Sequence, residues 1–200
     1  FGLGIRKQYQ SDGIDVSGIK VEPDCATGIA MIQVAESGEN NICISAEAND
    51  HLTAKVVSGF TDIIEQGDYL LVQLETPISG VEKAIDIAYS ANKKVVLNPA
   101  PASVLPDSLL SKVDILTPNE TEAQILTGIE VTDHLSASKA AQYLHQKGVL
   151  MVLITLGSKG VWVSQDGIGY LIPAFTVEAV DTTAAGDTFN GALIAGLTKG

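Results

Sequence analysis

The residues best suited to chemistry lie near the end of the chain, in the segment 181–192 with the sequence DTTAAGDTFNGA. The segment predicts a tight turn of small residues that opens a helix, with Asp187 in the first helical turn. The free N–H groups and the dipole of a helix N-terminus attract phosphate. A carboxylate is electrostatically unfavourable beside such an anion site, so we expect Asp187 to have a task. That task would be to accept a proton from a hydroxyl group while its oxygen attacks a phosphoryl group.

The same segment also fits a purely structural role. Small residues such as Ala, Gly and Thr let a helix start pack tightly on a neighbouring strand. An Asp in the first turn complements the helix dipole without doing any chemistry. Taken alone, the segment leaves both interpretations open, and the choice depends on polar residues elsewhere in the chain.

The elements that would position Asp187 alternate between strands and helices from about residue 52 onward. Strands are predicted at 69–73, 94–98, 114–117 and 150–155, helices at 52–65, 79–92, 119–126 and 136–147, and a hairpin at 160–163 and 168–172. Thr53 and a Ser79–Glu82 capping box mark two of the helix starts. Short apolar strands alternating with helices predict an α/β fold with a parallel sheet covered on both faces. In such sheets ligands bind beyond the carboxyl ends of the strands.

Polar side chains follow several of these strands. Glu75 can accept hydrogen bonds from sugar hydroxyls, although a solvated loop carboxylate fits equally well. Asn119 and Glu122 have the spacing of an ordinary capping box, yet Mg²⁺ keeps several waters and needs few protein carboxylates. The turn 155–160 either is a simple hairpin turn or binds a ligand, because its glycines permit close backbone approach and Lys159 can reach a phosphate.

The segment 181–192 closely resembles the C-terminal signature of the ribokinase family, also called the phosphofructokinase-B-type carbohydrate kinases. The strand-exit segments match the same family in the same order along the chain. The resemblance implies an ATP-dependent kinase that converts D-ribose to D-ribose 5-phosphate. It also implies that Asp187 is the catalytic base, and that the amides of Ala184, Ala185, Gly186 and Asp187 form an anion hole. Many family members carry Gly at the position of Ala184, and we expect its amide to serve equally with a negative φ.

The same resemblance gives roles to the other polar residues. Glu75 would contact the sugar together with Asp187. Glu122 would hold Mg²⁺ through water, and Asn119 would help to organise the metal and the nucleotide phosphates. Asp181 and Thr183 would belong to a monovalent-cation site, usually for K⁺. The turn that binds ATP would comprise Thr155, Leu156, Gly157, Ser158, Lys159 and Gly160.

Residues 26–34 and 41–45 predict a second hairpin, across a polar turn at 36–40. It is either an edge hairpin of the main sheet or, as the resemblance implies, part of a β lid. This lid, residues 21–46, would cover the sugar and join two subunits into a homodimer. We expect residues 1–200 to form a single, partial ribokinase-like domain. Relative to the family it would lack N-terminal strands that grip the sugar and a C-terminal segment that closes over the adenine.

Two alternatives to a ribose kinase stay open at this point. One is a kinase of the same family that acts on another sugar or a nucleoside, because substrate choice would lie largely in the N-terminal strands. The other is a non-catalytic regulator that binds a nucleotide or a sugar. The intact Asp187, Gly186, Asn119 and Glu122 argue against the regulator.

Composition excludes several other classes of protein. Apolar residues make up 46% of the 200 residues, which predicts a buried core, and the net charge of −12 argues against nucleic-acid or anionic-membrane partners. No run of 18 apolar residues is present, so we expect no membrane span and a cytoplasmic protein. Cys25 and Cys43 lack metal-type spacing and predict small buried residues rather than a disulfide. Trp162 predicts a core residue.

Overall fold

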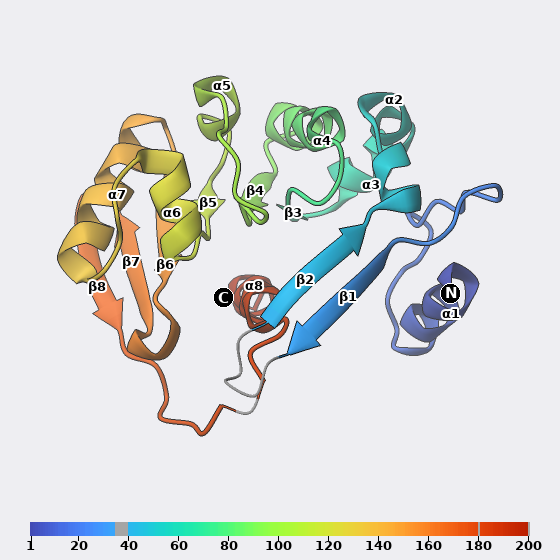
Figure 1. Cartoon of the computed structure of the whole chain (residues 1–200). Helices are drawn as coiled ribbons and strands as arrows, with labels where there is room; N and C mark the ends of the chain where they lie inside the picture. The colour runs from blue at the N-terminus through green and yellow to red at the C-terminus, as the bar shows by residue number, and fades with distance from the viewer. Residues whose placement is uncertain (35–39, 180, 200) are drawn as a thin grey trace.

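The computed structural model describes residues 1–34, 40–179 and 181–199 and shows a central sheet with helices on both faces (Figure 1). The strands lie in the order β3-β4-β5-β6-β7-β8. Their bounds are β3 Tyr69–Val72, β4 Lys94–Leu97, β5 Ile115–Leu116, β6 Met151–Thr155, β7 Val161–Gln165 and β8 Ile168–Ile172. Strands β3 to β6 are parallel, whereas β7 and β8 join antiparallel. The predicted α/β fold is confirmed, and the sheet is mixed because the β7–β8 hairpin extends its parallel part.

The two faces of the sheet carry different helices (Figure 1). One face packs against α4 (Ile78–Ser90), α5 (Asp107–Leu110), α6 (Glu120–Thr127) and α7 (His134–Gln146). The opposite face packs against α8 (Ala185–Leu197). Successive strand residues alternate between the faces, so Val95 and Leu97 lie under α4 to α7 while Val96 faces α8. The sheet is therefore covered on both faces, as the apolar strands predict.

The N-terminal part forms separate structure beside this sandwich. Helix α1 (Gly2–Ser11) precedes a two-stranded antiparallel sheet made of β1 (Ile29–Val34) and β2 (Asn40–Ser45). A short 3₁₀ helix, Glu47–His51, follows. The hairpin does not pair with the central sheet, so the alternative of an edge hairpin is wrong. Residues 36–39 of the predicted polar turn lie outside the described residues.

The single helix predicted over 52–65 is wrong. The chain forms α2 (Ala54–Val57), a 3₁₀ turn (Ser58–Phe60) and α3 (Thr61–Gln66) instead. Gly59 lies at the break, and glycine is a poor helix former because it loses much backbone freedom. Thr53 occupies the N-cap of α2, but its side chain makes no capping hydrogen bond.

The capping box predicted at Ser79–Glu82 is also wrong. Helix α4 begins at Ile78, with Pro77 at its N-cap, and no side chain caps it. Gly80 allows this helix start to lie close to the preceding chain, since a Cβ there would lie 2.0 Å from the carbonyl oxygen of Leu52. The first turn of α4 therefore packs directly on the backbone that leads into α2.

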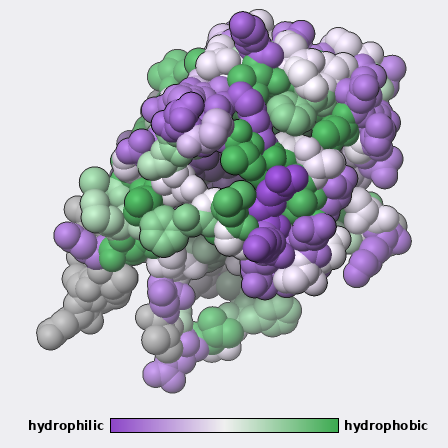
Figure 2. Space-filling model, turned by 90° about the vertical axis from the view of Figure 1, so that its right-hand side faces the viewer, coloured by the Kyte–Doolittle hydropathy of each residue, from purple (hydrophilic) through white to green (hydrophobic). Residues whose placement is uncertain are grey.

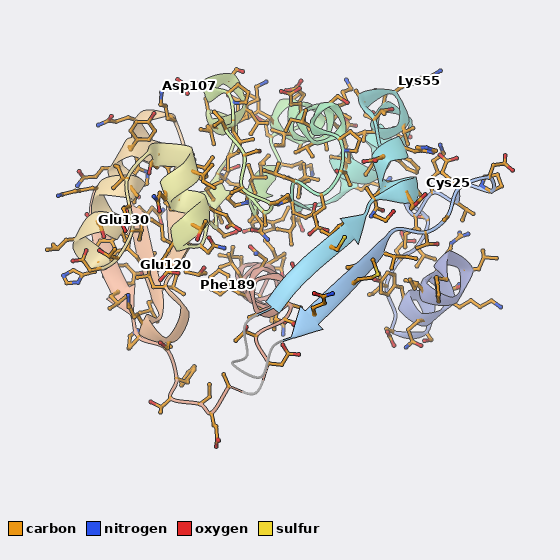
Figure 3. The ribbon with its side chains drawn as sticks, in the orientation of Figure 1. Cys25, Lys55, Asp107, Glu120, Glu130 and Phe189 are labelled. Carbon is orange, nitrogen blue, oxygen red and sulfur yellow. The ribbon has the colours of Figure 1, made fainter. Side chains whose placement is uncertain are left out.

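The two cysteines are less buried than the sequence predicts. Cys43 is exposed on β2, and Cys25 is only partly buried in the loop before β1 (Figure 3). The prediction that both are buried fails because each face of the β1–β2 sheet is largely open. Both are free, as predicted. Trp162 is buried in β7, which confirms its predicted place in the core.

The surface mixes hydrophobic and hydrophilic side chains. On the side that carries α2 and α3, hydrophobic patches alternate with hydrophilic side chains (Figure 2). Within the described parts of the chain, no helix combines the length and the apolar character that crossing a membrane requires.

Candidate active site

A cavity of about 230 Å³ lies where the parallel strands β4, β5 and β6 end. Its walls come from five parts of the chain: the β2 strand, the exits of these three strands, and the start of α8. The lining residues are Ile42, Asn98, Ala100, Thr117, Asn119, Glu122, Thr155, Thr182, Thr183, Ala184, Ala185, Gly186, Asp187, Phe189 and Asn190. The carboxyl edge of a parallel sheet is where α/β proteins bind ligands. The cavity is therefore the candidate site, and it contains most of the residues singled out in the sequence.

The start of α8 forms one wall. Ala184 is the N-cap, Ala185 begins the helix, and the exposed Asp187 lies in the first turn, as predicted. The amide of Ala185 donates to the carbonyl oxygen of Thr182 at 3.2 Å. Among the described residues, the amides of Gly186 and Asp187 make no hydrogen bond. These two N–H groups are therefore available to an anion, together with the positive end of the helix dipole.

The backbone of Ala184 corrects one expectation. Its φ is +59°, in the left-handed region, whereas a negative φ was predicted. The chain turns sharply between Thr182 and the first helical residue, and this turn requires a left-handed residue at the N-cap. An L-residue with a Cβ pays about 1–2 kcal/mol for that conformation. Ala184 therefore stores backbone strain beside the predicted anion hole.

Asn119 and Glu122 form the opposite wall as a complete capping box. The Glu122 amide donates to Asn119 Oδ1 at 2.8 Å, and the Asn119 amide donates to Glu122 Oε2 at 2.8 Å. Asn119 Nδ2 also donates to Glu122 Oε1 at 3.0 Å. Burial raises the pKa of the Glu122 carboxyl above its ordinary value, and the backbone hydrogen bond from Asn119 opposes this effect. The cap fixes a buried carboxylate at the edge of the cavity.

The turn after β6 brings only its first residue to the cavity. Thr155 lines it, and Leu156 is buried in the core, so any contact of Leu156 with a ligand would be through its backbone. Gly157 and Gly160 both have positive φ, and Gly160 packs against the carbonyl oxygen of Ile172. The Lys159 ammonium donates to the carbonyl oxygen of Thr132 at 2.9 Å. The lysine thus ties the turn to the loop before α7.

Asp181 and Thr183 lie just before α8. The Thr183 amide donates to Asp181 Oδ1 at 2.8 Å, and this backbone bond is the main reason that the pKa of Asp181 lies below its ordinary value. Thr183 lines the cavity, and its buried Oγ1 lies close enough to the Asp181 carboxylate to help lower that pKa, but it makes no hydrogen bond of regular geometry among the described residues. A buried hydroxyl without a partner is costly unless a ligand satisfies it.

Glu75 stands apart from the other predicted residues. It is exposed after β3 and is not among the residues that line the cavity described above. The connection is indirect, because the amide of Leu74 donates to the carbonyl oxygen of Ala100, a lining residue, at 2.8 Å. Glu75 therefore follows directly on a backbone contact with the cavity wall.

Comparison with known proteins identifies the family of the chain. The model of the pfkB family of carbohydrate kinases matches residues 1–200. The chain belongs to the pfkB family. It is similar to a ribokinase of Haemophilus influenzae, with 53% identity over 198 residues, 99% of this chain and 65% of that relative. The chain thus spans about two thirds of the length of that curated relative.

Solved structures agree with this pfkB-family fold. A crystal structure of ribokinase from Thermotoga maritima superimposes with a TM-score of 0.84 and 32% identity, covering 98% of this chain and 63% of that one. A structure of Arabidopsis thaliana ribokinase complexed with ribose and ATP gives a TM-score of 0.80 and 31% identity, covering 88% and 58%.

Several lining residues of this pfkB-family chain have no predicted role in the sequence analysis, among them the polar residues Asn98, Thr117 and Asn190. Asn98 and Thr117 each follow a buried strand, which is the signal that singles out Asn119. Asn190 lies one helical turn beyond Gly186 on α8, a spacing that places both on one side of a helix. Their contribution depends on the packing of α8 against the sheet, which no local pattern reveals.

Proposed function

We propose that this chain carries the catalytic centre of an ATP-dependent sugar kinase that transfers the γ-phosphoryl group of ATP to D-ribose. The products would be D-ribose 5-phosphate and ADP. The observation that supports this most strongly is the start of α8, where Asp187 and the unbonded amides of Gly186 and Asp187 face one cavity. The similarity to proteins named ribokinase supports ribose as the acceptor.

Asp187 is the proposed general base. Its carboxylate accepts the proton of a sugar hydroxyl while the hydroxyl oxygen attacks the γ-phosphorus in line, and ADP leaves. General-base catalysis of this kind contributes roughly 10²–10⁴-fold. The amides of Gly186 and Asp187, with that of Ala184, would donate to the oxygens of the transferring group, where preorganised donors are worth about 10²–10³-fold each. The Ala185 amide donates to the Thr182 carbonyl oxygen in this structure and would have to release it to join them.

Glu122 and Asn119 suit a Mg²⁺ ion that accompanies ATP. Both oxygens of Glu122 already accept hydrogen bonds from Asn119, which favours contact through water over direct coordination. Mg²⁺ retains several waters and uses few protein carboxylates. Among the described residues, no cluster of three or more His, Cys, Asp or Glu forms a cage for a metal. When bound, Mg²⁺ would neutralise phosphate charge during transfer.

Asp181 and Thr183 suit a monovalent cation, and we propose K⁺. The support is the buried Thr183 Oγ1, which lies near the Asp181 carboxylate but makes no hydrogen bond of regular geometry among the described residues, so two oxygens lie together at the cavity. Hydroxyl and carboxylate oxygens are ligands that hard cations prefer. Replacing Thr183 with Val should reduce the stimulation of turnover by K⁺, whereas equal stimulation in both proteins would remove Thr183 from the cation site.

Glu75 remains a predicted sugar ligand. Its place directly after the backbone contact between Leu74 and Ala100 supports this role. Replacing Glu75 with Gln should raise the KM for ribose and leave the KM for ATP unchanged. An unchanged ribose KM would identify Glu75 as a solvated loop carboxylate.

The β1–β2 hairpin is the proposed lid and dimer contact. Ile42 lines the cavity, so the face of the hairpin that carries Ile42 and its partner Ile32 covers the site. The opposite face carries the paired Met31 and Cys43, and Met31 is 62% exposed. Exposed apolar side chains on such a face favour a second subunit. A monomer at micromolar concentration in sedimentation of the full-length protein would contradict the proposed homodimer. The expected cytoplasmic location stays a prediction.

The test of the function is ADP release by the full-length protein with Mg-ATP, with and without K⁺. Ribose, fructose, adenosine and fructose 6-phosphate serve as acceptors. Ribose-dependent turnover is expected, and D187N should abolish it while ATP affinity stays nearly unchanged. Turnover with another acceptor would keep the mechanism and change the substrate. Turnover retained in D187N would remove Asp187 as the base, and no turnover with any acceptor would contradict the proposed function.

A further inference from the structure

A buried polar link connects α8 to the central sheet inside the cavity. The Thr117 hydroxyl donates to Asn190 Oδ1 at 2.8 Å, and Asn190 Nδ2 donates to the carbonyl oxygen of Gly186 at 2.9 Å. Both side chains are 4% exposed. Both polar atoms of the Asn190 side chain are therefore hydrogen-bonded. Its oxygen binds Thr117 on the sheet, and its nitrogen binds the first turn of its own helix.

The remaining contacts between α8 and the sheet are apolar. Phe189, Leu193, Ile194 and Leu197 pack around Val96, Ile115, Leu153 and Val163. The hydrophobic effect is itself non-directional, so the orientation that these contacts give α8 depends on how closely their side chains interdigitate. A buried hydrogen bond is directional, and the described residues contain no other one between α8 and the sheet or its exits. The Thr117–Asn190 bond is thus the one directional, buried contact between α8 and the sheet among the described residues.

The two ends of the link lie next to the two walls of the proposed active site. Asn119 follows Thr117 by two residues, and Asp187 precedes Asn190 by three. Asn190 also binds the backbone of Gly186, one of the residues whose free amides face the cavity. A change in this link would therefore move the base and the amides relative to Asn119 and Glu122.

We propose that Thr117 and Asn190 are positioning residues for phosphoryl transfer, which fix the first turn of α8 against the exit of β5. This inference rests on the proposed function. Neither side chain takes part in the chemistry, because their polar atoms bind each other and the backbone. Asparagine suits the position because it offers both an acceptor for Thr117 and a donor for the Gly186 carbonyl.

The test compares variants of the full-length protein in steady-state kinetics. T117V preserves shape and removes only the hydroxyl. It should lower kcat by about tenfold to a hundredfold, the effect expected when reacting groups shift by up to about 1 Å. The KM values for ATP and ribose should change by less than about threefold. T117S retains the hydroxyl and should restore kcat. The double variant T117V/N190L should lose no more than N190L alone, because both changes break the same link.

A matched control separates positioning from general destabilisation. L193A removes an apolar contact of α8 away from the cavity, so it should lower the melting temperature without lowering kcat. If T117V and L193A reduce kcat equally at equal loss of stability, the proposed positioning role is wrong. A kcat unchanged in T117V would also overturn it.

Hydrogen exchange keeps the inference testable if the proposed function fails. In T117V, the amides of residues 188–190 should exchange at least about tenfold faster than in the wild-type protein, while those of 195–197 stay unchanged. Equal exchange in T117V and wild type would overturn the anchoring of α8, whether or not the protein phosphorylates ribose. Absent wild-type turnover together with faster exchange would overturn the proposed function alone.

Discussion

The carboxylate of Glu122 takes two hydrogen bonds from a single residue, since the backbone and side-chain nitrogens of Asn119 each bind one of its oxygens. Glu122 is only 8% exposed, and burial raises the pKa of its carboxyl despite these donors. The same contacts that start α6 therefore hold a carboxylate, unfavourably desolvated, at the edge of the candidate site. The capping role is compatible with the proposed metal role through water, because both oxygens of Glu122 already accept a hydrogen bond.

This raised pKa predicts how stability depends on pH. A carboxyl whose pKa is higher in the folded than in the unfolded protein contributes fully below its unfolded pKa, about 4.3 for Glu, and loses this contribution as the pH rises through the folded pKa. The free energy of unfolding of wild type minus that of E122Q should therefore fall over this range. Urea denaturation of the two proteins at a series of pH values measures this difference in the free energy of unfolding.

The exposed Glu130, between α6 and α7, provides the matched control (Figure 3). The free energy of unfolding of wild type minus that of E130Q should vary less with pH than the same difference for E122Q. A wild-type advantage over E122Q that grows as the pH rises would show that the hydrogen bonds from Asn119 outweigh burial.

Replacing the strained Ala184 with Gly should stabilise the protein. Its φ of +59° costs a residue with a Cβ about 1–2 kcal/mol, and the greater freedom of Gly in the unfolded chain offsets about 0.4–1 kcal/mol of the gain. We expect a net gain of about 0.5–1 kcal/mol, which corresponds to a melting temperature higher by about 1–4 °C for a chain of this size. Calorimetry measures both the gain in stability and the rise in melting temperature.

Ala185 is the control for this change, because it lies inside α8. A185G should lower stability by about 0.5–1 kcal/mol, the usual cost of Gly in a helix. If A184G also lowered stability, the left-handed conformation at the N-cap would not be strained.

The two glycines of the turn after β6 should respond differently to Ala. A Cβ at Gly160 would lie 1.9 Å from the carbonyl oxygen of Ile172, whereas one at Gly157 meets open space. Both have positive φ. We expect G157A to cost about 1 kcal/mol, and G160A to cost at least about 2 kcal/mol more because backbone must move. Thermal unfolding of the two variants distinguishes them, and equal losses would contradict the close packing of Gly160.

Lys159 should affect nucleotide binding more than sugar binding. Its ammonium ties the proposed ATP-binding turn to the Thr132 carbonyl. A hydrogen bond from a charged group contributes about 1.5 kcal/mol, so K159M should raise the KM for ATP by up to about tenfold. The KM for ribose should stay within about twofold. K159R should recover most of the loss, whereas equal ATP KM values for K159M and wild type would show that the tether is dispensable.

Some features that follow from local sequence could be predicted. The Asn119–Glu122 cap depends on residues three positions apart, and it forms, whereas the Ser79–Glu82 capping box, an equally local pattern, does not. Helix α7 begins at His134, before the predicted residue 136, because Asp133 caps it by accepting from the amide of Ser136.

The conformation of Ala184 escaped prediction although it depends on the neighbouring residues 181–183, because no helix-start pattern describes how the chain turns into α8. Other features escaped prediction because they depend on distant segments. The exposure of Cys43 depends on whether another layer covers the β1–β2 sheet. The roles of Thr117 and Asn190 appear only when α8 is docked, since these residues are 73 positions apart in the chain.

That separation has a consequence for how the protein folds. The cost of closing a loop grows by about 0.6 kcal/mol with each doubling of its length, and contacts between distant residues form slowly. The β3–α4–β4 unit joins neighbouring segments, while α8 must close a much longer loop to reach Thr117. The sheet can therefore assemble before α8 docks, so a refolding chain should regain the sheet before the first turn of α8 reaches the cavity. The proposed active site would then be the last region to form.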